Sequence, residues 1–317
     1  MTGNTLGWVI VAFVLYLLMM IAIGAFYAKG NNNSEDYFLG GRKLNGFVAA
    51  LSAQASDMSG WLLMGLPGAI YLTGVGGDGW IAIGLFIGTT LNWLFIATKL
   101  RRYTIRANNS VTLPTYFENR FHDEKKVLMT VSSITIVVFF LVYCASALSA
   151  GGQLFESVFG IDYHVALTIG ALVVLVYTFL GGFTAVCVTD FIQGMLMLVG
   201  ILAVPLFAYH FLTSGGTTLS AGLEASGADS ANFLNLMKNG DGSNNIISVI
   251  SGLGWGLGYF GMPHILVRFM AVRDEKEMTK SKATAISWVA LSLGFAVFIG
   301  ILGRAYLPEL VNGNNEK

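Results

Sequence analysis

The chain has 317 residues, of which 55% are hydrophobic and only 11% are charged, and its formal net charge is zero. A soluble domain is nearer a quarter charged, so this composition excludes an ordinary soluble domain. The neutral balance excludes the strong positive field that draws proteins to nucleic acid, and we expect no nucleic-acid partner. The two cysteines lie in apolar runs and predict neither a metal cluster nor a disulfide framework.

Eight apolar runs predict eight membrane-spanning helices in an all-α membrane protein. Several runs reach the roughly 20 residues that a helix needs to cross a hydrocarbon core of about 30 Å. Helices pair their own backbone groups inside lipid, and the alternation typical of barrel strands is absent. The first run lacks the basic start and the cleavage site of a signal peptide, so it is predicted to be a true span. The predicted spans are residues 8–27, 47–73, 80–99, 128–158, 165–182, 191–212, 246–270 and 284–307.

Lysine and arginine predict the orientation in the membrane. Fifteen of the 18 basic residues lie in, or at the edges of, the loops that follow the first, third and seventh spans. The positive-inside rule makes these loops cytoplasmic and places the N-terminus outside. In the second of these loops, Pro114 predicts the start of an amphipathic helix along the membrane. The outer loop at about 213–244 is rich in small and polar residues and predicts a short helix but no domain.

Asp57 lies in the middle of the second span, where a carboxylate costs at least about 2.5–3.5 kcal/mol on insertion scales. Its neighbours Ser52, Ser56, Ser59 and Gly60 are small and polar or flexible, so we expect the helix to break here. Carbonyls, hydroxyls and one carboxylate form an oxygen-rich set that suits a small cation. The alternative is a buried ion pair with another helix, but intramembrane ionisable residues are functional by default.

The seventh span is interrupted by five glycines and Pro263 between Ser251 and His264. Glycine and proline are poor helix formers, so a second break is predicted here. Trp255 and Tyr259 lie one turn apart beside it. Small residues also let helices pack closely, and aromatic residues are often core, so packing remains an alternative to a substrate-lining role.

The two breaks together predict a transporter. Paired interrupted helices form the central site of inverted-repeat transporters. Spans two and seven are five spans apart, which predicts a five-plus-five fold preceded by an extra helix at 8–27. On this count residues 1–317 form one incomplete transporter domain. Its first repeat covers 47–212, and the start of its second repeat covers 246–307.

Asp190 follows Thr189 at the predicted start of the sixth span. A carboxylate is favoured there by the helix dipole, and a role in the ion path is the alternative. An aspartyl protease built from Asp57 and Asp190 is disfavoured, because its two carboxylates must share a proton at close range.

No P-loop, zinc spacing or nucleophile elbow is present, so we predict no catalytic residue and no enzyme. Paired breaks favour alternating access over a channel. A membrane sensor with a transporter-like domain remains an alternative.

Four stretches resemble the proline branch of the solute:sodium symporter family. They are Ala55–Gly68 and Trp255–Leu266, which look like the second and seventh helices of the family, Phe140–Ser146 in the fourth, and Tyr37–Arg42 in the first cytoplasmic loop. The resemblance runs from about residue 10 to the end. It implies a thirteen-helix protein of the bacterial inner membrane, embedded in the lipid bilayer, in which sodium entry drives uptake of L-proline. Sodium is the coupling ion and no other cofactor is implied.

The resemblance also implies roles for individual residues. Asp57 and the carbonyls of Ala55 and Met58 correspond to sodium ligands, and Asp190 lies near the inner sodium path. The proline pocket corresponds to Ser59, Gly60, Tyr143, Trp255, Tyr259 and Pro263. Members of the family continue for about five further helices, and a Ser/Thr pair on the ninth completes their sodium site. By resemblance this chain is an N-terminal portion that is not expected to transport by itself.

Overall fold

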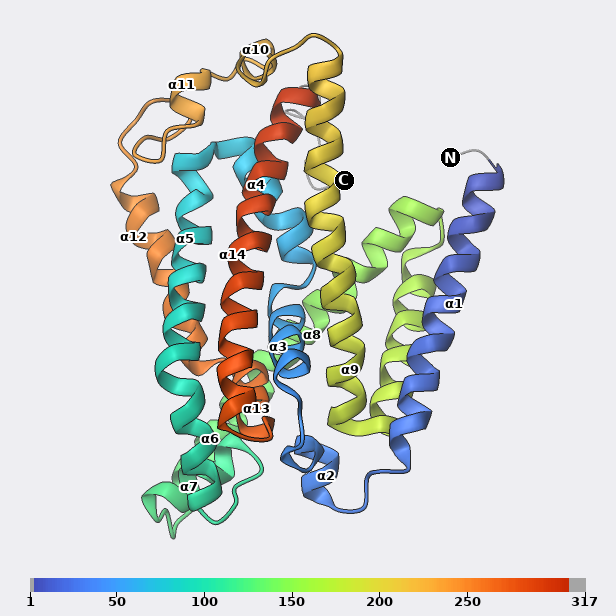
Figure 1. Ribbon diagram of the computed structural model, residues 1–317, viewed down its shortest axis with the longest axis vertical. Helices are drawn as coiled ribbons and strands as arrows, with labels where there is room; N and C mark the ends of the chain where they lie inside the picture. Colours follow the sequence, from blue (N-terminus) through green and yellow to red (C-terminus); the bar gives the residue numbers. More distant parts are fainter. Residues whose placement is uncertain (1–2, 308–317) are drawn as a thin grey trace. The chain divides into compact units, whose positions relative to one another are not determined.

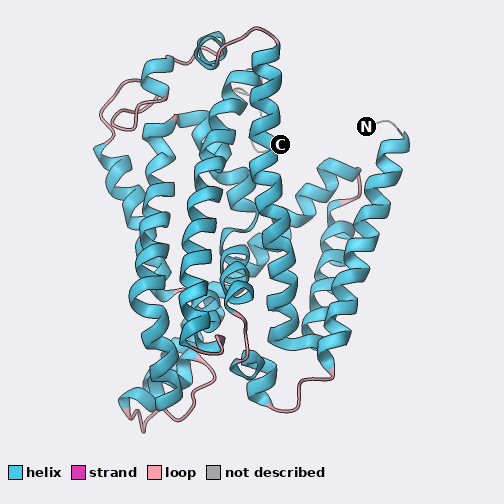
Figure 2. Ribbon diagram, in the orientation of Figure 1, coloured by secondary structure: helices cyan, strands magenta, loops and turns pink. Residues whose placement is uncertain are grey.

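The structure is a computed structural model that describes residues 3–307, and its regular secondary structure is entirely helical over that range (Figures 1 and 2). The predicted all-α class is therefore confirmed. The first half of the chain forms α1 (Gly3–Ala28), α2 (Ser34–Leu39), η1 (Gly40–Arg42), α3 (Gly46–Gly60), η2 (Trp61–Gly65), α4 (Leu66–Thr73), α5 (Val75–Leu91), η3 (Asn92–Ile96), α6 (Ala97–Arg106) and α7 (Leu113–Phe121). The second half forms α8 (Val127–Phe159), α9 (Tyr163–Ser214), α10 (Leu219–Ala225), α11 (Ser230–Phe233), α12 (Ile246–Trp255), η4 (Gly256–Gly261), α13 (Pro263–Ala271) and α14 (Glu275–Tyr306).

Every predicted apolar run coincides with helix, and the chain is a multi-pass membrane protein. Within the described residues, five helices are long and apolar enough to cross a membrane, or six if one bent pair is counted as a span. The number is below eight partly because α9 is counted once. Its 52 residues would extend about 78 Å as one straight helix, far more than one bilayer crossing requires. At Gly182 the backbone leaves the helical region (φ 59°, ψ −157°), which divides α9. The count of eight stays a prediction.

Two helices begin before the apolar runs that predicted them. The helix that contains the predicted sixth span continues without interruption from the break at Gly182, whereas the apolar run begins at 191. The predicted eighth span begins at 284, but α14 starts at Glu275, after Asp274 accepts a hydrogen bond from the Glu277 amide. The first two turns of α14, residues 275–282, are charged and polar, and hydropathy does not detect them.

The short helices outside the spans agree with the sequence. Thr112 caps α7 with a reciprocal capping box to Thr115, and Pro114 occupies its first turn as predicted. The 213–244 segment contains only the two short helices α10 and α11.

Both predicted breaks are present. In α3, Ser59 has φ 45° and ψ −158°, and a π-helical segment, η2, follows directly. In the seventh span, α12 passes into the 3₁₀ segment η4, and α13 starts at Pro263 after a bend of 47°. The residue before this proline, Met262, is extended, as the steric demand of a proline ring favours.

The chain folds into two compact units, each described here by itself. Unit 1 comprises Met1–Ala53, Ala97–Ile192 and Pro263–Ser281, and unit 2 comprises Gln54–Ile96, Gln193–Met262 and Lys282–Lys317. In unit 1, the Arg42 guanidinium donates to the carbonyls of Met270 and Ser110 at 2.8 Å each. This residue joins η1 to α13 and to the segment between α6 and α7. The assignment of residues 47–212 and 246–307 to two repeats stays a prediction.

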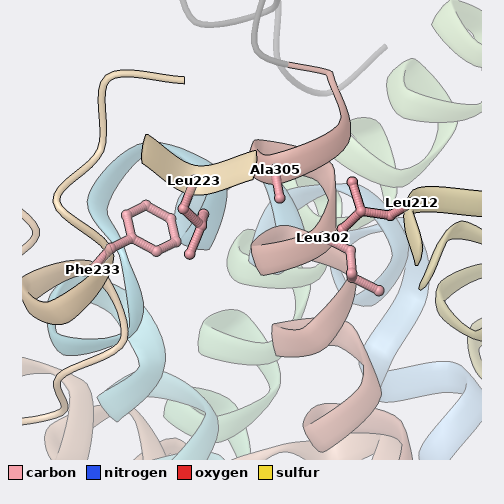
Figure 3. Close-up of a cluster of buried hydrophobic side chains, with 5 residues drawn as sticks. All are labelled: Leu212, Leu223, Phe233, Leu302 and Ala305. Atoms are coloured by element: carbon pink, nitrogen blue, oxygen red, sulfur yellow. The ribbon is translucent and has the colours of Figure 1, made fainter. Parts of the chain in front are cut away.

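Unit 2 has an apolar core at one end of α14 (Figure 3). Five buried side chains meet there, from α9, α10, α11 and α14, namely Leu212, Leu223, Phe233, Leu302 and Ala305. The cluster fixes the loop helices against α14. Arg304 strengthens the same junction by donating hydrogen bonds to the hydroxyl and the carbonyl of Ser226.

Candidate functional site: the broken helices of unit 2

Asp57 and Tyr259 bring the two broken spans together within unit 2. The Tyr259 hydroxyl donates a hydrogen bond to Oδ2 of Asp57 at 2.5 Å. Tyr259 is only 1% exposed, and Asp57 is partly buried in the last turn of α3. The sequence predicted both residues for the site and the structure places them in contact.

The break beside Asp57 occurs at a serine and not at a glycine. A positive φ is sterically unfavourable for a residue with a Cβ, and Ser59 adopts 45°. Such strained residues cost of order 1–3 kcal/mol and cluster at functional sites. A break in a helix disturbs the pairing of the carbonyls in the preceding turn, and Ala55 and Met58 lie in the turn before the break at Ser59. The local backbone therefore suits the carbonyl ligation that the resemblance implies for these two residues.

Trp61 is a neighbour of the predicted pocket that sequence reasoning missed. Its ring stacks on Trp255 with a centroid distance of 5.9 Å and an interplanar angle of 24°. Trp255 is half exposed, so the stacked pair offers an aromatic face in unit 2. Trp61 directly follows Ser59 and Gly60, and only its place after the break could have indicated this role.

The glycines of the seventh span divide into two groups. A Cβ added at Gly252 or Gly256 would fall within 2.6 Å of backbone atoms of α5, because these glycines pack against Trp80 and Gly84. In contrast, no atom lies within 4 Å of a Cβ added at Gly254 or Gly261. Packing explains the first group, as the alternative from sequence predicted. It does not explain the second group, whose glycines flank the break.

In unit 1, Tyr143 lies against the start of α13. Its ring stacks on the ring of His264 at a centroid distance of 5.5 Å, and Phe140 contacts the same histidine edge-on at 5.3 Å. His264 follows Pro263, the first residue of α13. The structure therefore brings Tyr143 and the Pro263 turn together. Ser59, Gly60, Trp255 and Tyr259 belong to unit 2.

Asp190 is an ion-pair partner inside unit 1. Its Oδ2 lies 2.9 Å from Nη2 of Arg268 and accepts a 2.7 Å hydrogen bond from the Ser52 hydroxyl. Arg268 also donates to Ser52 through Nε at 3.0 Å, so the three side chains form a closed triangle. The prediction that Asp190 lies in the first turn of a helix is wrong, because it lies eight residues beyond the break at Gly182. The helix-dipole interpretation therefore does not apply.

The groups beside Asp57 that could bind a cation are oxygen donors. Among residues 3–307, no group of three or more histidine, cysteine or acidic side chains could hold a metal ion. A transition-metal site in this range would require such a cluster. The donors beside Asp57 are one carboxylate, hydroxyls and backbone carbonyls, which are the ligands that hard cations prefer.

Comparison with known proteins agrees with these features. Residues 37–313 match the model of the Sodium:solute symporter family. The chain is 44% identical to the sodium/proline symporter of Salmonella typhimurium over 97% of this chain and 61% of that protein. The Escherichia coli sodium/proline symporter is 43% identical over the same shares, and that of Staphylococcus aureus is 44% identical over 94% of this chain and 56% of the relative.

A solved structure has the same fold. It is described as the substrate-bound outward-open state of a Na⁺-coupled sialic acid symporter, and it superposes with a TM-score of 0.75 at 21% sequence identity. The match covers 93% of this chain and 60% of that chain. This chain thus spans about three fifths of the length of the relatives it matches. With the family model covering residues 37–313 and the sequence identity extending over nearly the whole chain, the protein belongs to the sodium:solute symporter family.

Proposed function

We propose that the complete protein couples sodium entry to the uptake of L-proline. It resides in the bacterial inner membrane, with the N-terminus of this chain outside. The printed names of the relatives, at 43–44% identity over nearly all of this chain, support proline as the substrate and sodium as the coupling ion. The hydrogen bond from Tyr259 to Asp57 is the main structural support for this mechanism, because it connects the expected sodium site to the expected wall of the proline pocket.

Sodium binds at the break in α3. Asp57 supplies the negative charge, and the carbonyls of Ala55 and Met58 supply neutral oxygen ligands. The cation neutralises a carboxylate that is costly in the membrane, which stabilises the broken backbone around Ser59.

Proline binds beside this segment. Ser59 and Gly60 meet its charged groups, and Trp255 and Tyr259 pack against its ring. Tyr259 packs against the proline ring and also donates a hydrogen bond to the Asp57 carboxylate. Sodium binding at Asp57 therefore orders one wall of the proline pocket. Coupling then follows from the higher affinity of sodium for the proline-competent state.

The test is uptake of radiolabelled L-proline by vesicles that contain the complete gene product. An inward sodium gradient is expected to drive accumulation, and an equal potassium gradient is not. The membrane potential adds about 2.3 kcal/mol per charge per 100 mV, so an inside-negative potential should increase uptake. Equal uptake in sodium and potassium would overturn the proposal.

A further inference from the structure

The described part of unit 2 contains an anchoring contact that no sequence pattern indicated. Nδ2 of Asn92 donates a 2.8 Å hydrogen bond to the carbonyl of Tyr259. Asn92 is 1% exposed and opens the π-helical segment η3 at the end of α5. Its partner is the residue whose hydroxyl reaches Asp57. A continuous path of contacts therefore runs from α5, through the backbone and ring of Tyr259, to the Asp57 carboxylate.

Proline leaves the carbonyl of Tyr259 without an α-helical donor. In an α-helix this carbonyl would accept from the amide of residue 263, but Pro263 has no N–H. The segment is 3₁₀-helical here, and a 3₁₀ helix pairs each carbonyl with the amide three residues on. Asn92 adds a side-chain donor to the same carbonyl. The break that exposes the site is thus supported from a neighbouring helix.

The register between α5 and the seventh span makes this contact part of a regular series. Gly84 packs on Gly252 and Gly256, Gly88 packs on Gly256, and Asn92 meets Tyr259. Figure 1 shows α5 and α12 side by side. The last step is four residues along α5 but only three along the partner, which is 3₁₀-helical there. Four α-helical residues and three 3₁₀ residues both advance about 6 Å, so the alignment is kept through the change of helix type.

We propose that Asn92 is a positioning residue for the ion site: it fixes the backbone of Tyr259 so that the Tyr259 hydroxyl reaches Asp57. Asn92 touches neither sodium nor proline in this scheme. Its effect on sodium passes entirely through Tyr259. The test of this inference by sodium-dependent proline uptake rests on the proposed function. The hydrogen bond between Asn92 and Tyr259 does not depend on that function.

Matched variants separate this role from ordinary packing. Asn92→Ala removes the donor, and Tyr259→Phe removes the hydroxyl that it positions. Thr89→Val is the control, because Thr89 is 1% exposed on the same helix and its hydroxyl has no hydrogen-bond partner within the described structure. Asn92→Leu also removes the donor while filling the space of the side chain, and it replaces Asn92→Ala if that variant does not fold.

The first experiment measures the sodium concentration for half-maximal proline uptake by the complete protein. Asn92→Ala and Tyr259→Phe are each expected to raise it about tenfold, as the loss of a buried hydrogen bond to a charged or backbone partner allows. The double variant should be no worse than the more affected single variant. Thr89→Val should stay within about twofold of the wild type. Multiplying effects in the double variant, or an Asn92→Ala protein that behaves like Thr89→Val, would overturn the inference.

The second experiment needs neither sodium nor proline. Thermal unfolding of the purified complete protein in choline buffer is measured for the same two single variants and their double variant. Non-additive shifts in the midpoint support the coupling of Asn92 to Tyr259, and additive shifts overturn it. If the wild type shows no sodium-dependent proline uptake, the proposed function fails, and this second cycle still decides the inference.

Discussion

The hydroxyl of Tyr259, in the seventh span, donates a 2.5 Å hydrogen bond to Oδ2 of Asp57, in the second span. Tyr259→Phe keeps the aromatic ring and removes only this donor. We expect a raised half-saturation constant for sodium with a smaller change in the maximal rate of proline uptake, because the ring still lines the pocket. Sodium titration of uptake by the complete protein measures both quantities. A normal sodium constant in this variant would show that the bond does not serve the ion site.

The strained backbone at Ser59 predicts an unusual order of stabilities. Ser59→Ala and Ser59→Gly both remove the hydroxyl, but only glycine adopts φ 45° without a steric penalty. The glycine variant should therefore be more stable than the alanine variant by about 1–2 kcal/mol, the reverse of the order in an ordinary helix. Chemical denaturation of the two purified variants gives this difference. If alanine proved the more stable, Ser59 would be unstrained in solution.

The glycines that pack α5 against the seventh span in unit 2, among them Gly88 and Gly256, predict contrasting effects of an added Cβ at packed and unpacked positions. A Cβ at Gly88 would lie 2.2 Å from the carbonyl oxygen of Gly256, so Gly88→Ala must push α5 away from the seventh span. Overpacking of this kind costs about 1–3 kcal/mol. Gly254→Ala is the control, because no atom lies within 4 Å of its added Cβ. Thermal midpoints should fall for the first variant and stay equal or rise for the second, since alanine favours helix.

The ion pair between Arg268 and Asp190 in unit 1 predicts that replacing both residues partly offsets the loss of stability caused by replacing either one. The side chains of Arg268 and Asp190 are 7% and 11% exposed. Asp190→Asn leaves a buried guanidinium without its counter-charge, and such losses cost about 3–5 kcal/mol. Replacing both residues, with Asp190→Asn and Arg268→Gln, should be less destabilising than the two single changes added together. Additive losses in denaturation midpoints would show that the two groups do not interact in solution.

The sequence was sufficient for features that depend on local chemistry. A carboxylate among small residues indicated the break at Ser59, and glycines followed by Pro263 indicated the break in the seventh span. These signals are local because proline removes a donor and because an isolated charge is costly in lipid. The start of α14 could not be read from hydropathy, because its first two turns are charged and polar.

Long-range partners could not be read from the sequence. Arg268 lies 78 residues from Asp190, and Asn92 lies 167 residues from Tyr259. Asparagine in an apolar helix signals no particular partner, and the target on Tyr259 is a backbone carbonyl that every residue has. Pro263 reveals that this carbonyl lacks an α-helical donor, but it does not reveal that Asn92 contacts it.

The most direct test of the account is whether sodium and proline bind to the complete protein cooperatively through Asp57. The dissociation constant of L-proline is measured by equilibrium binding in sodium and in choline, for the wild type and for Asp57→Asn. Linkage requires that sodium strengthen proline binding by the same factor by which proline strengthens sodium binding, typically about 5–150-fold. We predict such a strengthening in the wild type and its loss in Asp57→Asn. Equal proline affinities in sodium and choline for the wild type would contradict the account.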